Sequence, residues 1–296
     1  VIAFRFITSG VGVILLISME LKKKKFVAHK SLKTLLNLHG FWTFLLCFTT
    51  FIESSIQYYT HLTLKEPSDL LMTPSHCLVR MAPQFFAISG SVTSMLVMSF
   101  ERCEASRNLS TYESSSSKSV NKFVALHVSF LSLGVFLDAV KYDFPTKVAH
   151  CSVGSVIGQN PQTALVGSFF LFSLFTIYFS SKLLRRNEYL HDSEEYLNMS
   201  LTERYQLCGN IRVLRLLLPI VVSHTSITMA GSVGHAYFVF GGYKKEYYPI
   251  LEDTINMVYL QGIAMPLIFL YRYRNKRVME SQIVTMNKWR RTHLCA

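Results

Sequence analysis

The chain has 296 residues, of which half are hydrophobic and 16% are charged. Soluble domains usually have about a quarter of their residues charged, so the composition indicates that lipid rather than water is the main solvent. The formal net charge of +12 does not indicate nucleic-acid binding, because the Lys and Arg residues separate apolar runs instead of forming a solvated basic face.

Stretches without Asp, Glu, Lys or Arg predict the membrane-spanning helices. A helix needs about 20 mainly apolar residues to cross about 30 Å of hydrocarbon. Seven such stretches predict one all-α domain over residues 1–296, a seven-transmembrane helix bundle with spans at about 2–19, 34–56, 78–100, 123–140, 163–184, 213–240 and 250–271. Within the sixth stretch, four glycines predict that the helix frays towards a loop: Gly231, Gly234, Gly241 and Gly242.

The distribution of basic residues predicts the orientation, because cytoplasmic segments hold an excess of Lys and Arg. One set of alternate segments holds 23 of the 30 Lys and Arg residues, and Arg80 lies inside the third span. The other set, together with the N-terminal stub, holds six. We therefore expect the N-terminus outside and the C-terminus in the cytoplasm. Lys22 to Lys25 follow the first apolar run, which favours an uncleaved anchor over a cleaved signal peptide.

Two cysteines are expected on the outer side. Cys77 stands at the outer end of the third span, and Cys151 lies in the external loop between the fourth and fifth spans. The outer compartment is oxidising, so we expect a disulfide that pins this loop over the bundle; two unrelated surface thiols are the alternative. The other cysteines lie in the membrane or on the reducing side and are expected to be thiols: Cys47, Cys103, Cys208 and Cys295.

An acidic–arginine pair, Glu101 and Arg102, closes the third span at its cytoplasmic end. Such a pair alone is weak evidence, since arginine is also a common interfacial anchor. Together with Cys77, about 37 Å of helix away, it resembles the third helix of G-protein-coupled receptors. The usual third member of the inner triplet, Tyr, is replaced by Cys103.

The end of the seventh span resembles the Asn-Pro-x-x-Tyr segment of the same receptors. Pro266 and Tyr271 carry this resemblance, although Met265 stands in place of Asn and the Tyr lies two residues further on. An ordinary proline kink with an interfacial Tyr is the alternative. Residues 272–289 are basic with interspersed apolar residues, which predicts a helix on the inner leaflet or, as the alternative, a disordered basic tail.

The connection between the fifth and sixth spans predicts a long sixth helix. Ser200 and Glu203 fit a capping box, so this helix should begin deep in the cytoplasm. The spacing of Arg204, Arg212 and Arg215 places them on one helical face, available to an acidic partner or to lipid phosphate. Snorkelling to lipid headgroups is the simpler alternative.

The same connection is similar to the nematode serpentine chemoreceptors of the Sra superfamily. The similarity lies in Arg-Tyr-Gln at 204–206 followed by Asn-Ile-Arg at 210–212, and in Glu101-Arg102 with the later Tyr112-Glu113 pair. The Srab and Sre classes fit best. This resemblance implies a seven-helix, G-protein-coupled-receptor-like protein in the plasma membrane of sensory cilia, which binds a small-molecule odorant or pheromone and couples to a heterotrimeric G protein.

Ionisable and polar residues within the spans are the candidates for ligand binding, because they are costly in lipid. Arg80 is expected to pair with Glu53 or Glu252, to meet an anionic ligand, or to snorkel into water. Gln84 lies one turn beyond Arg80 on the same face, and His224 lies in the sixth span. His39 and His127 are expected to form hydrogen bonds between helices.

The sequence does not favour an enzyme. It contains no HExxH, GxSxG, P-loop or paired-cysteine motif, and we expect neither a metal nor a cofactor. A ligand-gated seven-span cation channel and a small secondary transporter are the alternative functions. The seven-span channels found among insect odorant receptors have a cytoplasmic N-terminus, opposite to the orientation that the charge count predicts here. Transporters usually show an internal repeat, which is not visible in this sequence.

Overall fold

The computed structural model describes residues 1–23, 30–63, 72–110, 121–129, 159–240 and 257–272, and these residues are almost entirely helical. Residues 121–129 form a short helical stretch, and the last described helix, Val258–Arg272, begins with the 3-10 turn η3 (Val258–Leu260). The remaining helices are α1 (Ile2–Lys23), α2 (Lys30–Thr63), α3 (Pro74–Arg107), α6 (Gln159–Asp192), α7 (Glu195–Asn198) and α8 (Leu201–Phe240).

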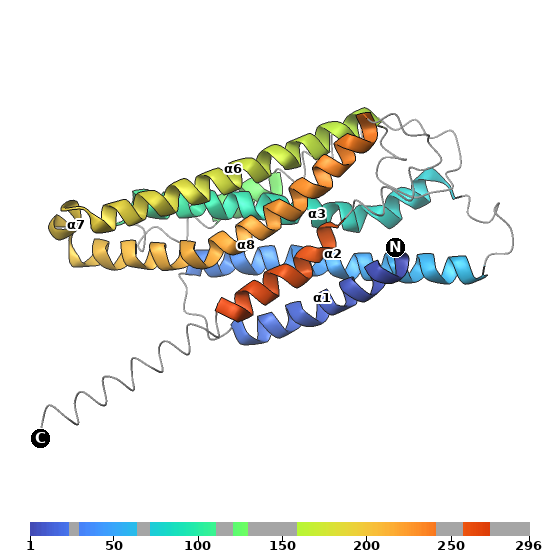
Figure 1. Cartoon of the computed structure of the whole chain (residues 1–296), viewed down its shortest axis with the longest axis horizontal. Coiled ribbons are helices and arrows are strands. Elements are labelled where there is room, and N and C mark those ends of the chain that lie inside the picture. Colours follow the sequence, from blue (N-terminus) through green and yellow to red (C-terminus); the bar gives the residue numbers. More distant parts are fainter. Residues whose placement is uncertain (24–29, 64–71, 111–120, 130–158, 241–256, 273–296) are drawn as a thin grey trace, which may run out of the picture.

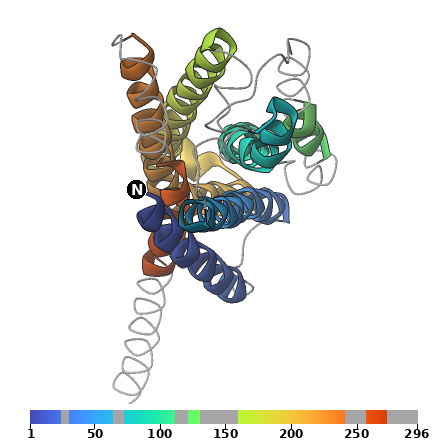
Figure 2. The same cartoon turned by 90° about the vertical axis from the view of Figure 1, so that its right-hand side faces the viewer.

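The long helices pack in a ring. α1 packs on α2, α2 on α3, α3 on α6 and α6 on α8, while η3 contacts both α8 and α1. α3 also contacts α8 across the ring. α6 and α8 lie side by side and are joined by α7 at one end (Figure 1). Residues 121–129 lie beside α3, on the side away from α8 (Figure 2).

The described helices have the lengths and surfaces that a membrane requires. Five of them, α1, α2, α3, α6 and α8, are long and apolar enough to cross a bilayer, and Val258–Arg272 is apolar but shorter in its described part. Large apolar side chains lie exposed on the outside of the bundle, among them Ile7, Ile14, Phe41, Leu171 and Phe175. Lipid tails solvate such a surface, so the all-α membrane bundle predicted from the sequence fits the described residues.

The helices extend beyond the charge-free stretches. α3 covers Pro74–Arg107 rather than 78–100, and α8 covers Leu201–Phe240 rather than 213–240. The difference arises because charge-free stretches mark the hydrocarbon layer, whereas a helix can continue among headgroups and water. With 40 residues, α8 is about 60 Å long, twice the hydrocarbon thickness, so its first turns project well beyond the lipid.

One prediction about the sixth span is wrong. Gly231 and Gly234 do not fray the helix, because both lie inside α8, which continues to Phe240. A glycine costs only about 1 kcal/mol in a helix interior, and tertiary packing outweighs that cost. The predicted spans 123–140 and 250–271 are described only over 123–129 and 257–271. Gly241, Gly242 and residues 273–289 of the predicted inner-leaflet helix lie outside the described residues.

The helix ends bring the basic segments together. At the end of the bundle where α7 lies, α1, α3 and α6 end and α2 and α8 begin (Figure 1). The segments that hold most of the Lys and Arg residues adjoin these helix ends in the sequence. The bundle therefore has one basic end, which the predicted orientation requires. Which end faces the cytoplasm stays a prediction, and below we call the α7 end the inner end.

Candidate functional site

The inner end of α3 carries a buried ion pair. The Nε of Arg102 donates to Oε2 of Glu101 at 2.6 Å, and its Nη2 donates to Oε1 of the same carboxylate. The Arg102 side chain is 3% exposed and the Glu101 side chain is not exposed at all. Removing one partner of such a pair leaves an uncompensated buried charge, which typically costs about 3–5 kcal/mol. The pair is therefore a fixed part of this conformation.

Arg102 also connects α3 to α8. Its Nη1 donates to Oδ1 of Asn210 at 3.1 Å. A guanidinium group only donates, so the oxygen of the Asn210 amide must face it and the Nδ2 must point away. That Nδ2 is buried and has no hydrogen-bond partner among the described residues. Asn210 thus holds Arg102 with one end of its amide and keeps two donor protons unused at the other end.

Further polar contacts join α3 to α6 along the same inner half. The hydroxyls of Ser99 and Ser180 lie 3.0 Å apart, and the hydroxyl of Ser106 donates to Oδ1 of Asn187. Ser106 follows Ser99 by seven residues on α3, and Asn187 follows Ser180 by seven residues on α6. Seven residues make two helical turns, so the two contacts lie on one face of each helix. Arg102, which lies one turn from Ser106, is therefore held between α6 and α8.

α6, α7 and α8 form a helical hairpin, and α8 begins at the predicted capping box. The Ser200 backbone N–H donates to Oε2 of Glu203 at 2.9 Å, and the Glu203 N–H donates to Oγ of Ser200 at 3.3 Å. The N–H and hydroxyl of Ser200 hold the pKa of Glu203 below its ordinary value. These reciprocal bonds satisfy donors that the first turn of α8 would otherwise leave unpaired.

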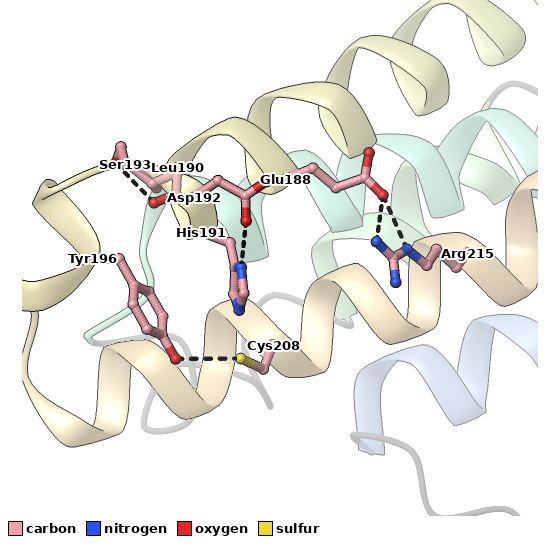
Figure 3. A network of polar contacts seen from close by, with 8 residues as sticks. All are labelled: Glu188, Leu190, His191, Asp192, Ser193, Tyr196, Cys208 and Arg215. Carbon is pink, nitrogen blue, oxygen red and sulfur yellow. Dashed lines mark hydrogen bonds and ion pairs between the residues drawn. The ribbon is translucent and has the colours of Figure 1, made fainter. Parts of the chain in front are cut away.

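Contacts across the hairpin join its two arms (Figure 3). Arg215 on α8 pairs with Glu188 on α6 through Nε and Nη2, both at 2.9 Å from Oε1. The Tyr196 hydroxyl lies 3.6 Å from the Cys208 sulfur, and this contact is the main reason that the pKa of Tyr196 is raised. The ring of Tyr196 packs against His191. The hairpin is thus held by side chains as well as by α7.

The three predicted basic residues of α8 have different surroundings. Arg204 donates to the backbone oxygens of Met199 and Leu197 and lies over the Tyr196 ring, so it closes the hairpin turn. Arg215 is occupied by Glu188, although that pair is largely exposed and so contributes little to stability. Arg212 is exposed, with no hydrogen bond or ion pair to another described residue. It is the one of the three most available to a partner.

A buried polar network links three helices in the middle of the bundle. The Ser91 hydroxyl on α3 donates to Oε1 of Gln261 at 3.0 Å and lies 2.9 Å from Nε2 of His224 on α8. Nε2 of Gln261 donates to the Thr228 hydroxyl at 3.0 Å, and that hydroxyl donates to the His224 backbone oxygen. Since the Ser91 proton faces Gln261, His224 must donate to Ser91 from Nε2. The four residues form a closed ring of hydrogen bonds that passes through the backbone oxygen of His224.

The predicted interhelical bonds of His39 and His127 are present. Nδ1 of His39 lies 2.9 Å from the Ser94 hydroxyl, and its ring meets that of His224 at 5.2 Å. Nε2 of His127 accepts from the Trp42 indole at 2.8 Å, so its Nδ1 carries the proton towards Thr93, 3.0 Å away.

Gly90 allows the close approach of α2 to α3. A β-carbon at this position would lie 2.3 Å from the Trp42 ring, where no side chain fits. The glycine therefore lets the large indole lie directly against the α3 backbone. The same indole carries the hydrogen bond to His127, so α2, α3 and residues 121–129 meet at this point.

At the outer end, Arg80 pairs with Glu53 rather than remaining open. Nε of Arg80 donates to Oε2 of Glu53 and Nη2 donates to Oε1, both at 2.7 Å. Nε2 of Gln57 donates to the same carboxylate at 3.1 Å. Gln84, one turn inward, donates to the Thr50 hydroxyl at 3.3 Å. The structure thus brings Glu53, Arg80 and Gln84 to one helix interface, while His224 lies deeper in the central network. Glu252 lies outside the described residues.

The remaining predicted site residues are placed as follows. Cys77 is disulfide-bonded, and Cys151 lies outside the described residues, so the pairing of these two cysteines stays a prediction. Cys47, Cys103 and Cys208 are free thiols, as expected. Pro266 is buried within Val258–Arg272, whereas Tyr271 is exposed and takes no part in the core. No group of metal-ligating side chains occurs in the described part of the chain.

Several residues of these sites were not predicted. Ser91, Thr228 and Gln261 are uncharged residues in apolar helices, and only the general tendency of buried polar groups to pair gives a signal for them. Asn210 was noticed only as part of a motif. Arg5 was counted with the basic residues of the outer segments, although the first predicted span of about 2–19 includes it, and it is almost fully buried in the first turn of α1. A buried arginine in a span is itself a functional signal.

The described helices form a bundle with polar sites at its outer end, middle and inner end, and five of them are long and apolar enough to cross a bilayer. The family model for the serpentine type seven-transmembrane receptors, class ab chemoreceptors, matches residues 1–292. The chain belongs to this family, which confirms the Srab alternative of the predicted resemblance. The fold class is therefore the G-protein-coupled-receptor-like bundle, and the chain is a multi-pass membrane protein of a chemoreceptor family.

A relative of known name is similar over most of the chain. Serpentine receptor class alpha/beta-14 of Caenorhabditis elegans is 23% identical over 230 residues, which cover 73% of this chain and 58% of that protein. The chain therefore spans somewhat more than half the length of this relative. Both comparisons are with proteins described as receptors.

Proposed function

We propose that the chain is a chemosensory receptor that binds a small molecule between the outer ends of its helices and activates a heterotrimeric G protein at its inner end. Its location would be the plasma membrane of sensory cilia, with the N-terminus outside. Membership of the chemoreceptor family supports the sensory role, and the basic inner end supports the orientation. A disulfide between Cys77 and Cys151 would hold the outer loop over the ligand.

The contact between Arg102 and Asn210 is the observation that carries this proposal. It joins α3 to α8 at the inner end, where a G protein would insert. A neutral amide holds a guanidinium less tightly than a carboxylate does, so α8 can leave Arg102 at a modest cost. Arg102 would then present Nη1, and Asn210 its amide, to acceptor groups of the inserted partner.

The central network supplies a route from the outer end to this contact. Ser91 and Arg102 lie on one helix, and His224 and Asn210 lie on another, so the same two helices carry both the network and the inner contact. A ligand that favours a different packing of α3 against α8 would change both together. The effect can be no larger than the difference in the ligand's affinity for the two packings.

Replacement of Arg102 by Ala tests the proposal. We expect less of the variant to reach the surface, because Glu101 loses its buried counter-charge, but the receptor that does reach it should bind ligand within a few fold of the parent. Its ligand-dependent coupling should fall by at least about 2 kcal/mol, which is roughly a 30-fold loss of nucleotide exchange. Exchange is measured on matched amounts of surface receptor, and binding is measured on the same membranes. Arg107→Ala, which removes an exposed arginine from the end of the same helix, is the matched control. Equal exchange by the Arg102 variant and the parent would refute the proposed switch.

A further inference from the structure

We propose that the outer ends of α2 and α3 hold a binding site for a small neutral molecule that donates hydrogen bonds, such as a primary alcohol. The inference rests on the proposed function, because it takes the outer end as the ligand-binding end. It is carried by a completed ion pair, Arg80–Glu53, beside two amide oxygens that lack donors among the described residues, those of Gln57 and Gln84.

The ion pair disfavours an anionic ligand. Arg80 uses Nε and Nη2 on Glu53 in a bidentate arrangement with both distances at 2.7 Å. The side chains are 16% and 7% exposed, so water screens the pair little. An anion could still reach the Nη1 donors, but it would lie close to the Glu53 carboxylate, and Arg80 already balances that negative charge. A second anion would therefore give the cluster a net negative charge, which disfavours carboxylates and phosphates.

The same pair disfavours a cationic ligand. The Glu53 carboxylate is neutralised by Arg80 and also accepts from Nε2 of Gln57 at 3.1 Å. An ammonium group would therefore find no unpaired negative charge here, and it would lie close to the positive charge of Arg80. The net charge of the cluster is zero, which leaves neutral polar molecules as the class that it can bind without displacing a partner.

The orientation of the two glutamine amides indicates that the ligand donates a hydrogen bond rather than accepts one. A carboxylate only accepts, so Nε2 of Gln57 must face Glu53 and its Oε1 must point away. Gln84, 3% exposed, donates from Nε2 to Thr50, and its Oε1 is the end without a partner. A buried acceptor without a donor costs about 1–3 kcal/mol, and a ligand hydroxyl would remove that cost.

The position of the site fits a short apolar chain on the ligand. Gln57 and Arg80 are only partly buried, so part of the cluster is accessible. Inward of Gln84, Ala87 packs in an apolar cluster with Leu46 and Val258. A molecule with one hydroxyl and an alkyl chain therefore matches the polar outer part and the apolar inner part of this interface better than a polyol does.

Thermal unfolding of the purified chain in detergent tests the proposal with four probes that each carry a six-carbon chain: 1-hexanol, hexanoate, hexylammonium and hexyl methyl ether. We expect 1-hexanol to raise the Tm of the parent by about 3 °C relative to the Gln57→Met/Gln84→Met variant. The other three probes should give no such difference, since they carry a charge or cannot donate. Without probe, the variant should have a stability similar to that of the parent, because it loses the two unpaired oxygens together with the hydrogen bonds to Glu53 and Thr50.

Ser173→Ala is the matched control, since it removes a different buried polar group without a partner among the described residues, a hydroxyl on α6 and away from α2. This control should keep the full response to 1-hexanol. A response to hexanoate or hexylammonium that depends on Gln84 would overturn the proposal. It would also be overturned if 1-hexanol raised the Tm of the parent and of the glutamine variant equally, or raised neither. The assay contains no G protein, so its failure leaves the proposed coupling intact. Normal hexanol binding without nucleotide exchange would reject the coupling alone.

Discussion

The central hydrogen-bond ring should show measurable coupling between α8 and the last described helix. Gln261 accepts from Ser91 and donates to Thr228 in a fully buried setting. Side-chain hydrogen bonds within membrane bundles contribute about 0.6 kcal/mol on average and up to about 1.7 kcal/mol. Gln261→Leu removes two of them and leaves the Ser91 proton without its acceptor, so we expect it to lower the free energy of unfolding by about 1–3 kcal/mol.

A double-mutant cycle isolates the bond between Gln261 and Thr228. Thr228→Val keeps the shape of the side chain and removes the hydroxyl, and its cycle with Gln261→Leu should give a coupling of about 0.6–1.7 kcal/mol. The measurement is equilibrium unfolding in mixed detergent micelles. Thr225 provides the matched control, because it is equally buried on α8 but bonds only to its own helix. A cycle between Thr225→Val and Gln261→Leu should give no coupling. If the Thr228 cycle is also additive, the ring does not link these helices.

Three further outcomes are expected. A cysteine introduced at Lys245 should react with an impermeant reagent on intact cells and one at Lys24 should not; the reverse labelling would reject the proposed orientation. Cys77→Ser should impair folding or surface delivery, and mass mapping should find Cys77 bridged to Cys151 in mature protein rather than as a free thiol. Ser200→Ala should destabilise the start of α8 by about 1 kcal/mol, seen as faster amide exchange over its first turn. In the parent, amide exchange over the same turn should also rise in acid. The pKa of Glu203 is lowered, so its cap is complete above the ordinary pKa of 4.5 and is lost as the pH falls through the lowered pKa.

The sequence was informative where a residue's chemistry leaves few choices. Charged residues in apolar runs must find partners, and this reasoning anticipated the Arg80–Glu53 pair as one of several possibilities. The capping box placed the start of α8, since Ser and Glu three residues apart satisfy the free donors of a first turn. His127 was expected to form a hydrogen bond between helices, because an imidazole in lipid needs partners for its polar nitrogens.

Other features depended on three-dimensional packing. Nothing in the local sequence shows that Ser91, Thr228 and Gln261, which come from three separate helices, would meet around His224. Asn210 likewise gains its meaning only because α8 passes beside Arg102. The fraying predicted from Gly231 was wrong because glycine propensity is a small local term, whereas contact with α6 is spread along the length of α8.

The central claim is that this chain passes a chemical signal to a G protein and does not conduct ions or carry solutes. The most direct test reconstitutes purified receptor into vesicles, adds a stimulus selected by screening, and records nucleotide exchange on added heterotrimer and ion flux in the same preparation. We predict stimulated exchange that requires Arg102, with no stimulus-dependent flux in the presence or absence of G protein. Stimulus-gated flux without G protein, together with no exchange, would contradict the account.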